Sequence, residues 1–165
     1  MSALITQHFF KNGIDLFHYQ SPSGGLFWNV MHEFPVYQLC ASNIMHLGIS
    51  LEAASRVTTL GFFLGGAAIL FQILNGIVGR TAATLSFVCY IISPFNIIYS
   101  RTGLIDFTAQ FFMLAMILFT FRSLKAERIS WNVGVAWISG ALAALIKCYI
   151  WFVPVSFIFG ALNFP

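Results

Sequence analysis

The sequence predicts an all-α protein, a polytopic transmembrane helix bundle of about four to five spans preceded by an external N-terminal region. Of its 165 residues, 59% are hydrophobic and only 8% are charged, and the mean hydropathy is +0.85. A soluble domain carries roughly a quarter charged residues, so the composition indicates an integral membrane protein. From Arg56 onward, long apolar runs alternate with brief charged interruptions, whereas residues 1–55 hold all four histidines and three of the five acidic residues.

These differences divide the chain into residues 1–55, an external loop and juxtamembrane region with short helices, and residues 56–165, the membrane bundle. A span needs about 20 apolar residues. The runs expected to form spans are 57–79, 81–100, 104–121, a shorter 131–146, and the start of a fifth at 149–165. Small residues at 61 and 65–68 give the first span a face suited to close helix packing. Pro94 is expected to kink the second span.

The cationic residues predict the orientation of the bundle. The loop between the first and second spans carries Arg80, and the loop between the third and fourth spans carries the cluster Arg122, Lys125 and Arg128. Both loops should be cytoplasmic, because cytoplasmic loops have an excess of arginine and lysine. The turn between Arg101 and Asp106, the end of the fourth span and residues 1–55 then face outside. Such an external region needs delivery, and residues 1–10 show neither a signal peptide nor a span. We therefore expect an N-terminal fragment of a larger enzyme that lacks an upstream helix.

The turn Ser100–Phe107 is the most informative segment, because Arg101 and Asp106 lie between two apolar runs without charge. A charge at the membrane edge is unfavourable unless it is solvated or has a function. The net charge of +3 is small and scattered, so no nucleic acid partner is expected. The three cysteines lie far apart without ligand spacing, and because two of them lie within or beside apolar runs they are expected to be small buried hydrophobic residues, with no redox inference.

Three stretches carry a resemblance to a known family. The first runs from residues 7–13 to His32-Glu-Phe-Pro-Val-Tyr-Gln38 and is followed by Gly48 and Arg56. The second runs from Ser93-Pro94 through residues 99–102 to Asp106. The third is Ala143-Ala-Leu-Ile-Lys147. In this order they resemble the GT-C membrane glycosyltransferases, the dolichyl-phosphate-mannose protein mannosyltransferase and aminoarabinose-transferase-like group. The resemblance covers nearly all of this chain but only the N-terminal part of such an enzyme.

The resemblance implies transfer of a sugar, hexosyl or pentosyl, from a polyprenyl-phosphate-linked donor to a lipid, glycan or protein acceptor. The chain is also expected to be a multi-pass protein whose active site faces a bacterial periplasm or an organelle lumen, and the style of the motifs favours the bacterial inner membrane. Cations near the membrane surface can stabilise the lipid phosphate as it leaves. A carboxylate can orient the acceptor hydroxyl or take its proton.

Carried over residue by residue, the resemblance implies that Glu33 and Asp106 are catalytic and that Arg101 and Lys147 bind substrate. Each also has a structural alternative. Glu33 could cap the helix expected to begin near Val36, and Asp106 could be an N-cap or first-turn carboxylate of the third span. Arg101 could pair with Asp106 or anchor the span at the interface, and Lys147 could be a snorkelling anchor. Arg56 is expected to be structural.

No metal ligand is assigned, although His32 beside Glu33 leaves a divalent metal open as a cofactor. One departure from the family pattern is important. Relatives carry their principal acidic residue just before the stretch that matches residues 2–5, and nothing acidic precedes Asp15 here.

Two other function classes stay open: a truncated, catalytically inactive accessory or structural membrane protein, and a transporter component. A transporter would place charges or broken helices near mid-bilayer, where this chain has only weakly polar residues such as Gln72 and Asn96. An accessory role predicts that Glu33, Arg101 and Asp106 do not converge. An enzyme predicts that they line one external cavity.

Overall fold

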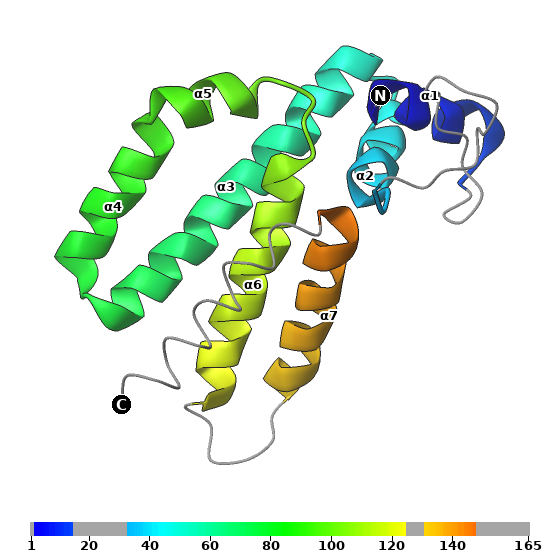
Figure 1. Ribbon diagram of the computed structural model, residues 1–165. Coiled ribbons are helices and arrows are strands. Elements are labelled where there is room, and N and C mark those ends of the chain that lie inside the picture. Colours follow the sequence, from blue (N-terminus) through cyan, green and yellow to red (C-terminus); the bar gives the residue numbers. More distant parts are fainter. Residues whose placement is uncertain (1, 15–32, 125–130, 148–165) are drawn as a thin grey trace.

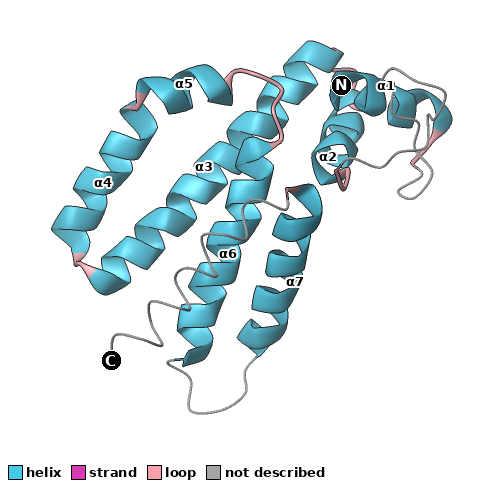
Figure 2. Ribbon diagram, viewed as in Figure 1, coloured by secondary structure: helices cyan, strands magenta, loops and turns pink. Residues whose placement is uncertain are grey.

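The computed structural model describes residues 2–14, 33–124 and 131–147 (Figure 1). In these residues it has helices and no strands, which confirms the all-α prediction. The elements are α1 (Ser2–Asn12), α2 (Val36–Met45), α3 (Leu51–Ile77), α4 (Arg80–Ile92), α5 (Pro94–Ser100), α6 (Asp106–Leu124) and α7 (Trp131–Ile146). Short loops join α3 to α4, α4 to α5 and α5 to α6 (Figure 2).

The long helices α3, α4, α6 and α7 run side by side, with α3 packed between α4 and α6, and α7 packed on α6. The short helices α1, α2 and α5 gather at one end of this bundle, the upper end in Figure 1. The first residues of α3 and α6 and the last residues of α7 lie at that same end. The upper end is therefore where segments distant in sequence meet.

Within the described residues, two helices, α3 and α6, are long and apolar enough to cross a membrane, and α4 with α5 makes a third if the bent pair is one span. Helix α7 has 16 residues, or about 24 Å at 1.5 Å per residue, against a hydrocarbon core of about 30 Å. The expected start of a further span at 149–165 lies outside the described residues.

Helix α3 begins at Leu51, earlier than the expected start at residue 57. Ser50 caps it, because its hydroxyl accepts a hydrogen bond from the backbone N–H of Ala53 at 3.4 Å. Glu52 in the first turn suits the positive end of the helix dipole. With 27 residues, α3 is about 40 Å long, so its first turns extend beyond a hydrocarbon core of about 30 Å.

The predicted kink at Pro94 is confirmed, since α4 and α5 meet at an angle of 57°. Proline lacks the N–H that would bond the carbonyl four residues earlier, which belongs to Tyr90. The side-chain amide of Asn96 donates to this carbonyl at 2.7 Å instead. Asn96 therefore has a structural role in the bend.

The predicted small-residue face of the first span is confirmed at residues 65–67 of α3. A Cβ added at Gly65 would lie 2.9 Å from the Phe111 ring of α6, and Gly66 and Ala67 are buried. Gly61 does not take part, because a Cβ there would meet nothing within 4 Å. Close approach of α3 and α6 thus depends on part of the small-residue stretch.

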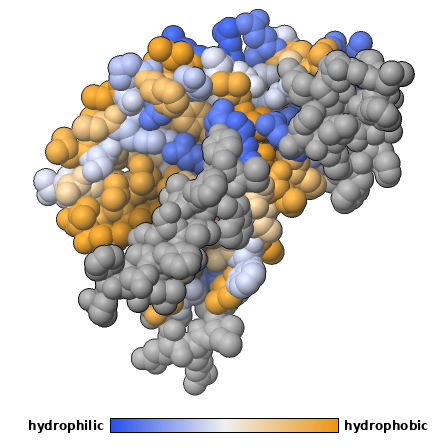
Figure 3. Space-filling view, in the orientation of Figure 1, coloured by the Kyte–Doolittle hydropathy of each residue, from blue (hydrophilic) through white to orange (hydrophobic). Residues whose placement is uncertain are grey.

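Apolar and polar side chains separate along the bundle. In Figure 3 the flank over α3 and α4 is mainly hydrophobic, and hydrophilic residues gather toward the upper end. Large apolar side chains such as Leu64, Leu85 and Ile92 are 48%, 66% and 60% exposed on these helices, as suits a lipid-facing surface. At the opposite end, the Arg122 guanidinium donates to the Gln72 side chain at 2.8 Å and joins α6 to α3.

Candidate active site

A cavity of about 780 Å³ opens at the upper end of the bundle. All four site residues predicted from the sequence line it, although they come from separate segments. They are Glu33 before α2, Arg101 after α5, Asp106 at the start of α6 and Lys147 at the end of α7. The remaining lining residues are Ser2, Ala3, Leu51, Glu52, Ser55, Arg56, Gly103, Leu104 and Ile105. The convergence that an enzyme predicts is therefore present.

Asp106 and Lys147 form an ion pair across two packed helices. The Lys147 ammonium donates to Asp106 Oδ1 at 2.5 Å. Asp106 is the first residue of α6, where the helix dipole favours a carboxylate, and Lys147 continues the last turn of α7 through a bond from its N–H to the Ala143 carbonyl. Their side chains are 37% and 18% exposed, so the pair is partly buried, with the lysine further from water.

Glu33 is brought to the cavity by the backbone that follows it. The N–H of Phe34 donates to the carbonyl of Leu145 at 3.0 Å, which holds the segment before α2 against the end of α7. Helix α2 begins at Val36 as expected, but its N-cap position is Pro35 and no side chain caps it. Glu33 is therefore not the cap of α2, and it lines the same cavity as Lys147.

Arg101 lies in the turn that leads from α5 to α6. Its N–H bonds the Ile98 carbonyl at 3.2 Å, and its side chain is exposed. Among the described residues the Arg101 guanidinium has no hydrogen-bond or ion-pair partner, and the carboxylate of Asp106 pairs with Lys147 instead. Arg101 lines the cavity, and the planar guanidinium group can donate two parallel hydrogen bonds to a phosphate.

Tyr37 of α2 supports this turn from below, a role that the sequence did not reveal. Its ring is 1% exposed, and its hydroxyl donates to the Ser55 carbonyl of α3 at 3.0 Å with the Thr59 hydroxyl 3.2 Å away. A Cβ added at Gly103 would lie 3.2 Å from the Tyr37 hydroxyl and 3.4 Å from Ser55 Cβ. The turn that carries Arg101 thus rests directly on α2 and α3. The buried cluster beneath it joins Tyr37 to Ile105, Ala109 and Ile146.

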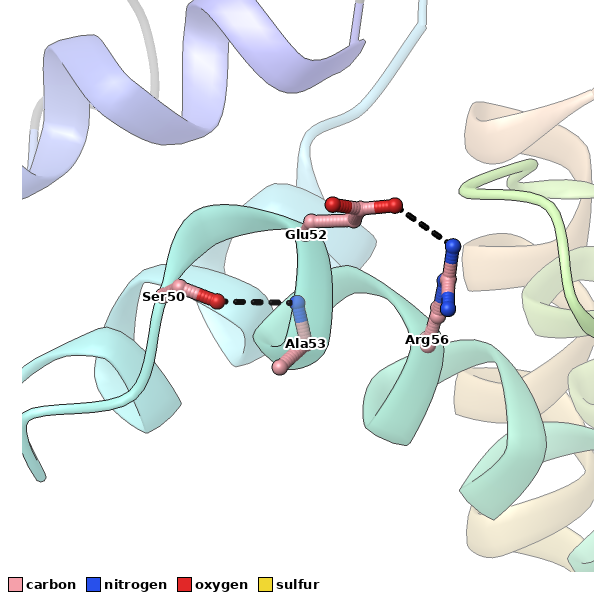
Figure 4. Close-up of polar contacts among 4 residues, drawn as sticks. All are labelled: Ser50, Glu52, Ala53 and Arg56. Atoms are coloured by element: carbon pink, nitrogen blue, oxygen red, sulfur yellow. Dashed lines mark hydrogen bonds and ion pairs between the residues drawn. The ribbon is translucent and has the colours of Figure 1, made fainter.

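Glu52 and Arg56 also line the cavity, although no binding role was expected for either residue from the sequence. Arg56 Nη2 lies 2.5 Å from Glu52 Oε1, and the side chains are 61% and 76% exposed (Figure 4). The signal that could have found them is an acid and a base four residues apart directly after a capping serine. Arg56 was expected to be structural, and its side chain both pairs with Glu52 and lines the cavity.

The described cavity residues do not fit a resident metal ion. No group of three or more histidine, cysteine, aspartate or glutamate side chains that could hold a metal occurs within residues 2–14, 33–124 and 131–147. Glu52 and Asp106 are both engaged by cations. His32, the possible metal partner of Glu33, lies outside the described residues. Ser2 and Ala3 of α1 also line the cavity.

The apolar helices and the charged cavity at one end of the bundle indicate an integral membrane protein with its candidate site at that end. Residues 32–165 match the dolichyl-phosphate-mannose-protein mannosyltransferase family, and the chain belongs to this family. It is thus a membrane glycosyltransferase by class, in a family that uses polyprenyl-phosphate-linked sugar donors and glycan or protein acceptors. The matched range contains all four predicted site residues, whereas residues 7–13 lie outside it. Comparisons with curated proteins and with solved structures find no match to this chain.

Proposed function

We propose that this chain transfers a sugar from a polyprenyl-phosphate donor to a hydroxyl of a lipid, glycan or protein acceptor at the outer face of a membrane. The observation that carries the proposal is the convergence of Glu33, Arg101, Asp106 and Lys147 in one cavity at the end of the bundle. An inactive accessory protein gives no reason for charged residues from four segments to meet.

Arg101 and Lys147 are the proposed phosphate ligands. As the bond between the sugar and the phosphate breaks, the phosphate leaves with the electron pair and gains negative charge. Fixed cations where charge develops stabilise the transition state. Because Lys147 is neutralised by Asp106, the unpaired guanidinium of Arg101 supplies most of the local positive charge.

Glu33 and Asp106 are the proposed catalytic carboxylates. The acceptor oxygen forms a bond to the anomeric carbon, and its proton passes to a carboxylate within hydrogen-bond reach. Glu33 is the proposed proton acceptor. Asp106, held in one orientation by Lys147, is proposed to position the reacting hydroxyl. No metal is required for this sequence of steps.

The proposed orientation places the cavity outside, in the periplasm of a bacterial inner membrane. Arg80 and Arg122 lie at the end opposite to the cavity, as the excess of cytoplasmic arginine and lysine requires. Cysteines introduced at Ser2 and Ser123 test this in intact cells. A membrane-impermeant thiol reagent should label the first and not the second, and the reverse pattern contradicts the orientation.

The test of function uses the full chain in lipid nanodiscs with a polyprenyl-phosphate-linked sugar and an acceptor mixture. The rate of polyprenyl phosphate release is the readout. Glu33→Gln and Asp106→Asn should each lower the rate by about 100-fold or more, the usual contribution of a positioned acid or base. Arg80→Ala at the opposite end is the matched control and should leave it unchanged. Full activity in both carboxylate variants refutes the proposal, and donor binding without turnover by the wild type favours an accessory role.

A further inference from the structure

We propose that Arg56 is an additional phosphate ligand of the cavity and that Glu52 competes with the phosphate for it. This inference rests on the proposed function, because it names a further residue that would bind the lipid phosphate. Arg56 and Glu52 both line the cavity that holds Arg101 and Lys147. They approach it from α3, whereas Arg101 and Lys147 approach it from α5 and α7.

The start of α3 sets the position of the pair. The cap formed by Ser50 with the N–H of Ala53 fixes the first turn, so that Glu52 and Arg56 lie one turn apart on the same face (Figure 4). These first turns extend beyond the apolar length of the helix. The side chain of Arg56 can therefore reach a phosphate at the membrane surface while the backbone of α3 stays helical.

The two ion pairs of the cavity differ in how easily a ligand can open them. The side chains of Arg56 and Glu52 are 61% and 76% exposed, and exposed pairs at this spacing are weak. The side chains of Lys147 and Asp106 are only 18% and 37% exposed, so separating them leaves charge in poorer solvent. When Arg56 turns to a phosphate, Glu52 remains solvated at the favourable end of α3. The exposed pair is thus the one that exchanges.

The reaction creates a need for this additional cation. The donor phosphate is a diester with one negative charge, whereas the released monoester carries about −1.5 to −2 at neutral pH. The described residues that line the cavity include three carboxylates, Glu33, Glu52 and Asp106, against three cations. Release of Arg56 from Glu52 lets a second guanidinium join Arg101 as the charge grows. The affinity for polyprenyl monophosphate should consequently depend more strongly on Arg56 than the affinity for the sugar donor does.

The test is equilibrium binding of polyprenyl monophosphate to the full chain in nanodiscs. Arg56→Ala should weaken binding about tenfold, as for loss of a charged hydrogen bond. Glu52→Gln should tighten it by about twofold, as for removal of a weak helical ion pair. Arg56→Lys should fall between wild type and Arg56→Ala, because an ammonium cannot form the bidentate contact. Arg80→Ala is the matched control and should not alter binding.

The opposite signs separate a ligand from a structural ion pair. If the pair only stabilises α3, Arg56→Ala and Glu52→Gln should lower the melting temperature equally and leave the affinity for polyprenyl monophosphate unchanged. This result would overturn the inference. Arg101→Ala distinguishes the two levels of the account. Weakened binding in Arg101→Ala with unchanged binding in Arg56→Ala defeats this inference alone, whereas unchanged binding in both variants defeats the proposed phosphate site itself.

Discussion

Replacing Gly103 with alanine tests how the cavity is assembled. The new Cβ would lie 3.2 Å from the Tyr37 hydroxyl, closer than most Cβ contacts, and 3.4 Å from Ser55 Cβ, at the edge of ordinary van der Waals contact. Tyr37 cannot move away easily, because it is 1% exposed and its hydroxyl is bonded to the Ser55 carbonyl. The turn should therefore move instead, and Arg101 and Asp106 should move with it.

The expected magnitudes follow from these contacts. Gly103→Ala should lower the free energy of unfolding by about 1–3 kcal/mol, as for overpacking in a tight site. Tyr37→Phe removes the hydrogen bond to the Ser55 carbonyl and the one accepted from the Thr59 hydroxyl, which should together cost about 0.5–1.5 kcal/mol because Thr59 can still bond the Ser55 carbonyl. In the double variant the oxygen that collides with the new methyl group is gone. Its cost should approach that of Tyr37→Phe alone, well below the sum of the two single effects.

The assay combines denaturant unfolding of the chain in detergent with the rate of polyprenyl phosphate release. Gly103→Ala should lower that rate at least tenfold, since small displacements of positioned groups are costly to catalysis, and Tyr37→Phe should partly restore it. Gly61→Ala is the control, because a Cβ there meets nothing within 4 Å, and it should be neutral or slightly stabilising. Strictly additive effects on stability, or no loss of activity in Gly103→Ala, would refute the role assigned to this contact.

Three further outcomes are expected. Asp106→Asn should lower the free energy of unfolding by about 1–2 kcal/mol after allowance for partial exposure. Lys147→Met should lower it by less, because the charge left without its partner is then that of Asp106, which is the more exposed of the two side chains. The reverse order in denaturant unfolding would contradict this prediction. Gly140→Val should lower the melting temperature more than Gly140→Ala, because its Cβ would lie 2.7 Å from the flexible Met116 sulfur of α6; equal melting temperatures argue against tight α6–α7 packing. Burial raises the pKa of the Cys40 thiol, so alkylation of this cysteine should be slow near neutral pH, and rapid alkylation there would contradict the prediction. The contribution of the protonated Cys40 to folding stability should be complete below the ordinary thiol pKa and should be lost as the pH rises through the raised pKa.

The features that the sequence predicted correctly depend on local chemistry. Pro94 bends the second apolar run whatever surrounds it, because the missing N–H and the ring are properties of proline. The small residues at 65–67 allow close packing wherever a partner helix lies. The convergence of Glu33, Arg101, Asp106 and Lys147 followed from their common position at span ends and from the family resemblance.

The features that the sequence did not predict depend on contacts between distant segments. The contact of Tyr37 with Ser55 and Gly103 joins three elements, and no local pattern marks it. The early start of α3 came from a cap and an ion pair that composition does not register.

The most direct test of the central claim is photo-crosslinking with a polyprenyl phosphate that carries a photoreactive group on its first isoprene unit. The full chain in nanodiscs is irradiated, and the labelled peptides are identified by mass spectrometry with unlabelled polyprenyl phosphate as competitor. If the cavity binds the lipid phosphate, the turn between Arg101 and Asp106 and the first turns of α3 should be labelled, and the competitor should abolish this labelling. Labelling confined to the opposite end, around Arg80 and Arg122, would contradict it.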